Sequence, residues 1–210
     1  MKNFLSVVKQ LSVVVALGLL AGGLYLLVDA WSAMGKAASG ERLATMEASE
    51  NYQEDGFGNP IPQKDYEMVP MMIRWFGSNP AIVEPTDALP LQKRKRSDYA
   101  EGDADKLRVT WLGHSTTIIE IDGKRILTDP VWSERASPFS KLGPKRFHEP
   151  PLNQDELPTV DAVLISHDHY DHLDEASIRF LQRKKVQFLV PLGIGAHLEY
   201  WGVDPQFITE

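Results

Sequence analysis

The chain has 210 residues, of which 43% are hydrophobic and 24% charged, so it can bury a core and does not have a disordered composition. Its formal net charge of −7 argues against a broad nucleic-acid-binding face, which needs clustered positive charge. Because it contains no cysteine, disulfides and thiolate ligands are excluded, and any metal must be held by nitrogen and oxygen atoms.

The first element is an uncharged apolar stretch at residues 10–28, QLSVVVALGLLAGGLYLLV. Its length is close to the roughly 20 residues that cross a bilayer as a helix and exceeds the roughly 7–15 residues of a signal-peptide core. Tyr25 and Trp31 stand where interfacial aromatic residues gather. We expect residues 1–35 to form a membrane anchor. The alternatives are a signal peptide cleaved near Ala33-Met34-Gly35 and a buried core helix.

Membrane orientation is weakly encoded, because lysines and arginines stand on both sides of this stretch in nearly equal number. The free amino terminus favours an N-inside arrangement, with the following domain on the non-cytoplasmic side. After cleavage the protein would instead be secreted or periplasmic.

Residues 36–106 are expected to connect the anchor to the domain and to pack on it. A short helix is predicted in MGKAASGERLATMEASE, and the Gly-, Pro- and Asn-rich segments that follow predict loops. The apolar stretch MVPMMIRWF is expected to pack on the domain, with contact to membrane or lipid as the alternative. The basic run QKRKRSD is expected to be a solvated loop, with attraction to anionic headgroups as its alternative.

The organised domain is expected from residue 107. Alternating apolar residues predict strands at 107–113, 116–121 and 125–128, with a hairpin turn at Asp122-Gly123. After a proline-rich loop, DAVLIS and VQFLVP predict buried strands, while DEASIRFLQRK and GIGAHLEYWG predict helices. Asp174 is the expected N-cap of the first helix. Strands followed by strand–loop–helix units predict a layered α/β domain.

The segment SHDHYDHLD, residues 166–174, gathers metal-seeking side chains in a short run. His167 and His169 follow a strand at a spacing that aims both imidazoles the same way, and Asp171 and His172 form an adjacent pair in the next turn. One metal could take each pair, and two metals roughly 3.5–4 Å apart would bridge a hydroxide. Imidazole and carboxylate ligands suit zinc, with iron or manganese as alternatives.

Four linked motifs carry a family resemblance: WLGHST, LTDPVWSERASPF, GPKRF and LPTVDAVLISHDHYDHLD. They resemble the metallo-β-lactamase superfamily, and within it the N-acyl-phosphatidylethanolamine-hydrolysing phospholipase D group and its bacterial relatives. The resemblance implies an αβ/βα sandwich with a dinuclear metal site. Residues 107–210 would be its N-terminal half, so the sandwich is expected to be truncated in this chain.

The resemblance assigns roles to individual residues. His167 and His169 would bind one zinc, and Asp171, also the catalytic carboxylate, would bind the second together with His172.

Further residues are placed by the same motifs. Tyr170 would contact a lipid substrate, or simply pack beside the site. Asp129 would orient a metal-bound imidazole, or act as a turn residue before Pro130. His114 would line the edge of the site or have a structural role, and His148 and His197 are taken as ordinary loop and helix residues.

The resemblance implies a metal-dependent hydrolase, most simply a phosphodiesterase acting on phospholipid-like substrates through a metal-bridged hydroxide. A lactone or ester hydrolase of the same superfamily is an alternative. The family's third histidine, bridging aspartate and last histidine lie in the other half of its fold, so this chain alone is expected to lack a complete active site. A non-catalytic, metal-binding remnant is therefore the second hypothesis.

Overall fold

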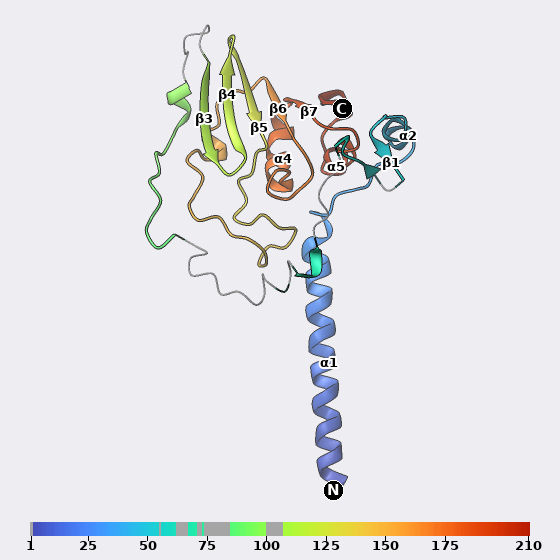
Figure 1. The fold of residues 1–210 in the computed structure, drawn as a ribbon. Helices are drawn as coiled ribbons and strands as arrows, with labels where there is room; N and C mark the ends of the chain where they lie inside the picture. The colour runs from blue at the N-terminus through green and yellow to red at the C-terminus, as the bar shows by residue number, and fades with distance from the viewer. Residues whose placement is uncertain (1, 55, 62–66, 71–72, 74–84, 100–106) are drawn as a thin grey trace.

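The computed structural model describes residues 2–54, 56–61, 67–70, 73, 85–99 and 107–210, and shows a long helix joined to an α/β domain (Figure 1). Helix α1 (Lys2–Trp31) projects away from the domain. Its segment Gln10–Trp31 has a mean hydropathy of 2.4 and is 0% buried. At about 1.5 Å per residue this segment is long enough for the ~30 Å hydrocarbon layer of a membrane. The described residues leave most of this segment exposed, which contradicts the alternative of a buried core helix.

The domain is built on a six-stranded sheet in the order β3-β4-β5-β6-β7-β8. The strands are β3 (Arg108–Gly113), β4 (Thr116–Ile121), β5 (Lys124–Thr128), β6 (Ala162–Leu164), β7 (Gln187–Leu189) and β8 (Ile208–Thr209). The first three pair antiparallel, and β5 to β8 pair in parallel. Asp122 and Gly123 both have positive φ, as a two-residue hairpin turn requires, which confirms that prediction.

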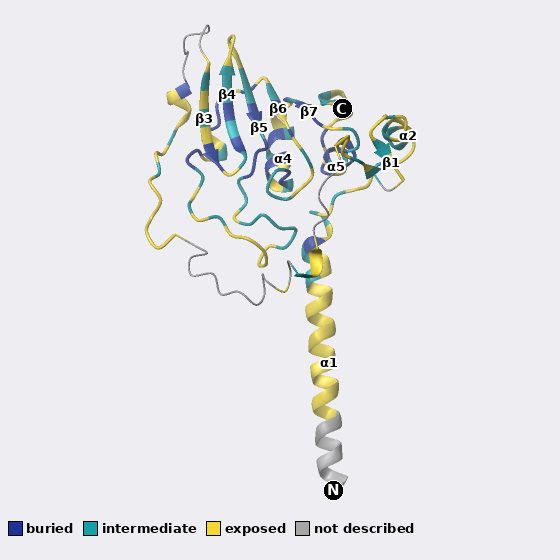
Figure 2. Cartoon of the chain, viewed as in Figure 1, coloured by how far each residue is buried: buried dark blue, intermediate teal, exposed yellow. Residues whose placement is uncertain are grey.

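One face of this sheet forms the core (Figure 2). The strand register aligns four fully buried side chains across it: Ile118, Leu127, Val163 and Phe188. Helix α4 (Glu175–Leu181) and helix α5 (Gly195–Tyr200) add buried apolar residues to the same cluster. The parallel strands with their helical crossovers confirm the predicted α/β class.

The opposite face of the sheet is apolar but uncovered by the described residues. Its neighbouring strands present side chains that are well exposed: Val109, Trp111, Leu164 and Leu189. In β3 the indole of Trp111 is 64% exposed. The two faces of the sheet thus differ sharply in how well they are packed.

Asp174 is the N-cap residue of α4, as predicted, but its side chain has other partners. It makes no capping hydrogen bond. Its carboxylate instead accepts hydrogen bonds from the backbone N–H groups of Trp132 and Ser133, both at 3.2 Å, and from the hydroxyl of Ser133 at 2.7 Å. This buried carboxylate fastens the chain after β5 to the start of α4.

The connecting region contains helix α2 (Glu41–Glu47), as predicted, and a small hairpin of β1 (Tyr52–Gln53) and β2 (Gly56–Phe57). Arg42 of α2 pairs with Glu199 and Glu210 of the domain, both at 2.7 Å. The hydrogen bond from Arg42 lowers the pKa of Glu199. In the stretch MVPMMIRWF, Met68, Val69 and Ile73 are exposed and Pro70 is half-buried, while its other residues lie outside the described part of the chain.

The basic run QKRKRSD is not a freely solvated loop. Arg94 donates its backbone N–H to the carbonyl of Pro151 at 2.7 Å, and Arg96 donates to Glu156 and to the carbonyl of Asp155. The run leads into a 3-10 helix, η1 (Arg96–Tyr99). It is therefore fixed to the domain surface, while Lys93, Lys95 and Arg96 stay exposed to solvent as predicted.

The end of α1 is fastened to the domain. Ala30 is only 3% exposed, and the carbonyl of Ser32 accepts a 2.9 Å hydrogen bond from the indole of Trp201. Lys36 donates its backbone N–H to Nδ1 of His197 at 3.1 Å. Burial lowers the pKa of His197, which favours the neutral ring that can accept this bond.

Gly35 is the point of closest approach in this junction, so Gly35→Ala is expected to loosen it. A Cβ there would lie 2.0 Å from Nδ1 of His197, and φ is +66°. Gly40→Ala is the matched control, since φ is +60° but nothing lies within 4 Å. Both variants carry backbone strain, and we expect Gly35→Ala to cost about 1–3 kcal/mol more through overpacking. Urea unfolding in detergent micelles would measure this, and equal losses would show that the ring does not hold the junction.

Candidate metal centre

The histidine motif lies in the turn between β6 and α4. The backbone N–H groups of His172 and Leu173 both donate to the carbonyl of His169, at 2.9 and 2.8 Å, which folds the segment back on itself. The ring of His167 lies 4.6 Å from that of His169 and 4.0 Å from that of His172, measured between centroids. The turn therefore gathers three imidazoles at one end of the sheet.

A second segment brings His114 to the same place. His114 lies in the β3–β4 turn with φ of +47°, and its Nε2 is 2.7 Å from Oδ2 of Asp171. Nε2 of His172 lies 3.7 Å from the same oxygen. One donor atom from each of these three residues falls within 4.8 Å of the others. Sequence reasoning placed His114 at the edge of the site, and the structure brings it into contact with a predicted ligand.

Two hydrogen bonds fix the β3–β4 turn against the motif. The indole of Trp111 donates to the carbonyl of His114 at 2.8 Å, and the hydroxyl of Ser115 donates to the carbonyl of Asp171 at 2.8 Å. Burial acts to raise the pKa of Asp171, but hydrogen bonds from its own backbone and from His114 outweigh this and lower the pKa. The carboxylate is thus kept in the ionised form that binds a cation.

Asp129 sits beneath the motif at the end of β5. Its side chain accepts hydrogen bonds from the backbone N–H of Ser166 at 2.7 Å, from the Ser166 hydroxyl at 2.8 Å and from Nδ1 of His172 at 2.9 Å. An imidazole that donates through Nδ1 keeps the lone pair of Nε2 free for a metal. The structure thus brings Asp129 into contact with the imidazole of His172, and its role in orienting a metal ligand stays a prediction.

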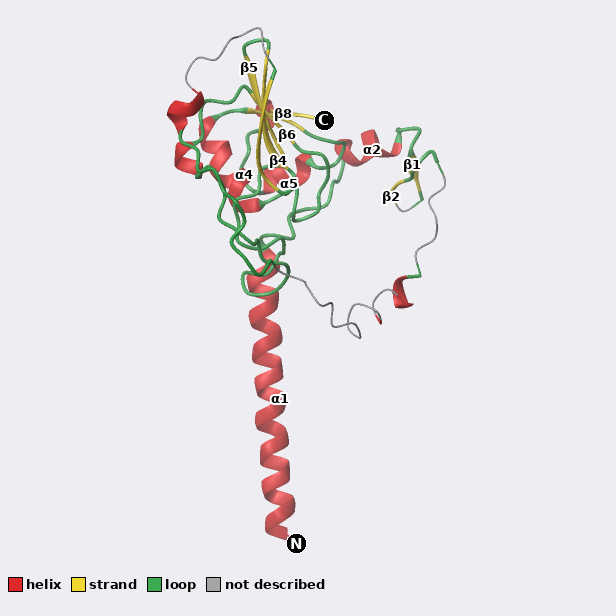
Figure 3. Cartoon of the chain, turned by 60° about the vertical axis from the view of Figure 1, so that its left-hand side comes forward, coloured by secondary structure: helices red, strands yellow, loops and turns green. Residues whose placement is uncertain are grey.

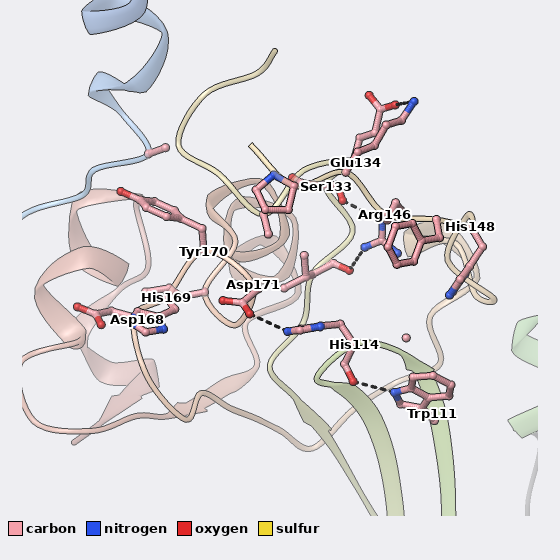
Figure 4. A pocket seen from close by; sticks show the side chains of 18 of the residues that line it. Trp111, His114, Ser133, Glu134, Arg146, His148, Asp168, His169, Tyr170 and Asp171 are labelled. Carbon is pink, nitrogen blue, oxygen red and sulfur yellow. Dashed lines mark hydrogen bonds and ion pairs between the residues drawn. The ribbon is translucent and has the colours of Figure 1, made fainter. Parts of the chain in front are cut away.

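A pocket of about 940 Å³ opens beside this cluster (Figure 4). One end carries His114, His169, Tyr170 and Asp171, and burial raises the pKa of Tyr170. His167 and His172 are not among the lining residues, so they contact the pocket less directly than the other motif residues.

The other walls come from segments that sequence reasoning did not assign to the site. They are the loop after β5 (Arg146, Phe147 and His148), Trp201 of the domain, and the end of the α1 junction (Ala33 and Met34). His197 also lines the pocket. Arg146 donates to the carbonyls of Val131 and Ser133 at 2.9 and 3.0 Å, and burial lowers its pKa. The motif GPKRF, which contains Arg146, is the sequence signal that could have placed this part of the loop at the site.

Residues 124–210 match the model of the Beta-lactamase superfamily domain, which confirms the resemblance to that superfamily seen in the sequence. An uncharacterised protein of Mycobacterium tuberculosis is 41% identical over 209 residues, covering 93% of this chain and 55% of that protein. The N-acyl-phosphatidylethanolamine-hydrolyzing phospholipase D 1 of Caenorhabditis elegans is 40% identical over 99 residues, 46% of this chain and 28% of that protein. The chain thus spans about half the length of the mycobacterial relative.

Two further likenesses cover smaller parts. A metal-dependent hydrolase of Caldivirga maquilingensis is 46% identical over 66 residues, 31% of this chain and 23% of that protein. The solved structure of an isothiocyanate hydrolase from Delia radicum gut bacteria aligns with a TM-score of 0.38 and 26% identity, over 49% of this chain and 40% of that one.

Proposed function

We propose that this protein is a metal-dependent hydrolase of the β-lactamase superfamily that cleaves a phosphodiester in a phospholipid-like substrate. The observation that carries the proposal is the convergence of His114, Asp171 and His172, with His167 and His169 beside them, at the end of a large pocket. Ion-binding donors gathered beside a pocket of this size are typical of a catalytic site.

The donor set fits a divalent metal such as zinc, with manganese or iron also suited to nitrogen and oxygen ligands. Such an ion supplies an activated water and stabilises charge on the leaving oxygen. Within the chain, Asp129 holds the imidazole of His172 in position. His114 holds the carboxylate of Asp171 at 2.7 Å. We propose His167 and His169 as ligands of one ion and Asp171 and His172 as ligands of the other.

Three features support a lipid-like substrate. Relatives in Caenorhabditis elegans and in yeast mitochondria are named as phospholipases D that hydrolyse N-acyl-phosphatidylethanolamine. The pocket combines apolar side chains such as Met34 and Phe147 with the cationic Arg146 and Lys145. Its wall includes Ala33 and Met34, which follow shortly after a helix that has the length and apolarity of a membrane span. We propose that Tyr170, which lines this pocket, contacts the substrate.

We also propose that α1 is retained as a membrane anchor, with the domain on the non-cytoplasmic side. Cleavage near Gly35 would remove Ala30, Ser32 and Asp29, whose contacts fasten the helix to the domain. It would also remove Ala33 and Met34 from the pocket wall.

The test is hydrolysis by the protein purified from the cells that make it and loaded with zinc or manganese. We expect cleavage of N-acyl-phosphatidylethanolamine in mixed micelles and its loss after chelation. Hydrolysis of a water-soluble phosphodiester alone would overturn the lipid part of the proposal. Hydrolysis of a lactone or carboxylic ester without any phosphodiester cleavage would overturn the reaction class.

A further inference from the structure

The loop after β5 forms an ordered arm, residues 134–146. Arg146 donates its backbone N–H to the carbonyl of Glu134 at 2.9 Å, and Ala136 donates to the carbonyl of Pro144 at 3.0 Å. Arg135 and Lys145 form an antiparallel bridge between these two bonds. The two sides of the arm are therefore paired, and its tip is residues 137–143.

The tip of the arm is fastened to α1. The backbone N–H of Ser140 donates to Oδ2 of Asp29 at 2.8 Å. Asp29 lies in the last turn of α1, just before Trp31, where the apolar segment Gln10–Trp31 ends. Figures 1 and 3 both show loops of the domain around this end of the helix. If α1 spans a bilayer, the tip must lie at the level of the membrane surface.

The chemistry of the arm suits that location. It carries Arg135, Lys141, Lys145 and Arg146 against a single acidic residue, Glu134, which pairs with Lys145 at 2.8 Å. Lys141 is exposed at the tip, and the neighbouring Leu142 is 48% exposed. Each cation near an anionic leaflet contributes about 1 kcal/mol of attraction, and an apolar tip residue can enter the interfacial layer.

We propose that the arm is a membrane-contacting element whose tip binds the anionic phospholipid headgroups of the leaflet at the C-terminal end of α1. The base of the arm, Pro144 to Arg146, lines the pocket together with the next residue, Phe147, and with Ala33 and Met34. The pocket mouth is thereby held against the leaflet, so that a lipid can reach it from the bilayer surface. This inference rests on the proposed anchoring by α1 but not on catalysis.

The experiment uses the absence of cysteine in the full chain. Single substitutions Leu142→Cys at the tip, Lys124→Cys at the far β4–β5 turn and Leu20→Cys in α1 are labelled with a nitroxide. The proteins are reconstituted in vesicles of phosphatidylcholine alone or with phosphatidylglycerol. Oxygen and a water-soluble nickel complex then report by electron paramagnetic resonance how deeply each label lies.

We expect the label at 142 to be shielded from nickel, and more so with phosphatidylglycerol, while the label at 124 stays aqueous. Lys141→Ser is expected to lower the ratio of membrane-contacting to aqueous label about fivefold in anionic vesicles, the effect of ~1 kcal/mol. If the label at 142 is exposed to water while the label at 20 is buried in the bilayer, the proposed membrane contact of the arm is wrong but the anchoring by α1 is supported. An aqueous label at 20 would overturn both. Neither result depends on whether the protein hydrolyses a phosphodiester.

Discussion

Replacing His172 with alanine is expected to abolish tight binding of zinc or cobalt by this chain. His172 supplies one of the three donor atoms that lie within 4.8 Å of one another, and it is the donor whose orientation is fixed, by a 2.9 Å bond to Asp129. Without it, two donors remain in that group, which is a poor site for a divalent ion. We expect affinity to fall by more than about 100-fold, because the loss of an outer residue that merely orients a ligand already costs 10–100-fold.

The matched control is His148→Ala. His148 lines the same pocket, but its Nδ1 lies 2.8 Å from the carbonyl of Glu149 and it belongs to no group of donors within reach of one ion among the described residues. Titration of the chain in micelles with cobalt, followed by its visible absorption, compares the two. Full binding by His172→Ala, or equal loss in both variants, would show that the ion is held elsewhere.

The second large effect is expected at Asp129, which is 7% exposed and has φ of +39°. Asp129→Ala removes the acceptor for three hydrogen bonds, two from Ser166 and one from His172. Leaving a fully buried donor unpaired costs about 1–3 kcal/mol in general, and these three donors, which are only partly buried, cost less each. Alanine also tolerates this backbone conformation poorly. We expect the free energy of unfolding to fall by about 2–4 kcal/mol and metal affinity to fall about 10–100-fold.

Asp129→Asn separates the two consequences. Asparagine tolerates positive φ and keeps the shape, so most of the stability should remain. Its amide N–H₂ would face His172, however, and would favour the tautomer with the proton on Nε2, which cannot bind a metal. Urea unfolding and cobalt titration of both variants would test this. Normal metal binding by the Asp129→Asn variant would show that Asp129 does not orient His172 for metal binding.

The strands were predictable from the sequence because their signals are local. Alternation of apolar residues marked β3 and β4, and Asp122-Gly123 set the turn between β4 and β5. The helices proved shorter than expected, because the segment after Leu181 tightens into a 3-10 turn, η3 (Gln182–Lys184). Asp174 carried a capping signature, yet a distant backbone segment competes for its carboxylate.

The candidate site was predictable only where it is contiguous. The motif from His167 to His172 could be read directly, and its gathering of imidazoles follows from one turn. The contact of His114 with Asp171 depends on how the β3–β4 turn and the turn after β6 come to the same end of the sheet, although β5 separates β4 from β6. The sequence does not encode this arrangement locally. The contact of His197 with the segment after α1 could not be predicted either. The sequence indicated an ordinary helix residue, but its Nδ1 accepts a hydrogen bond from the backbone N–H of Lys36.

One face of the sheet is left uncovered by the described residues, and this affects how the protein behaves in the laboratory. Val109, Trp111, Leu164 and Leu189 offer apolar surface to which dyes such as anilinonaphthalene sulfonate bind, even in a fully folded chain. Dye fluorescence normally indicates a molten globule. Here it would be high even when the core of the protein is well packed. Near-ultraviolet circular dichroism of the buried Trp201, on the packed side, is the sounder measure of native structure.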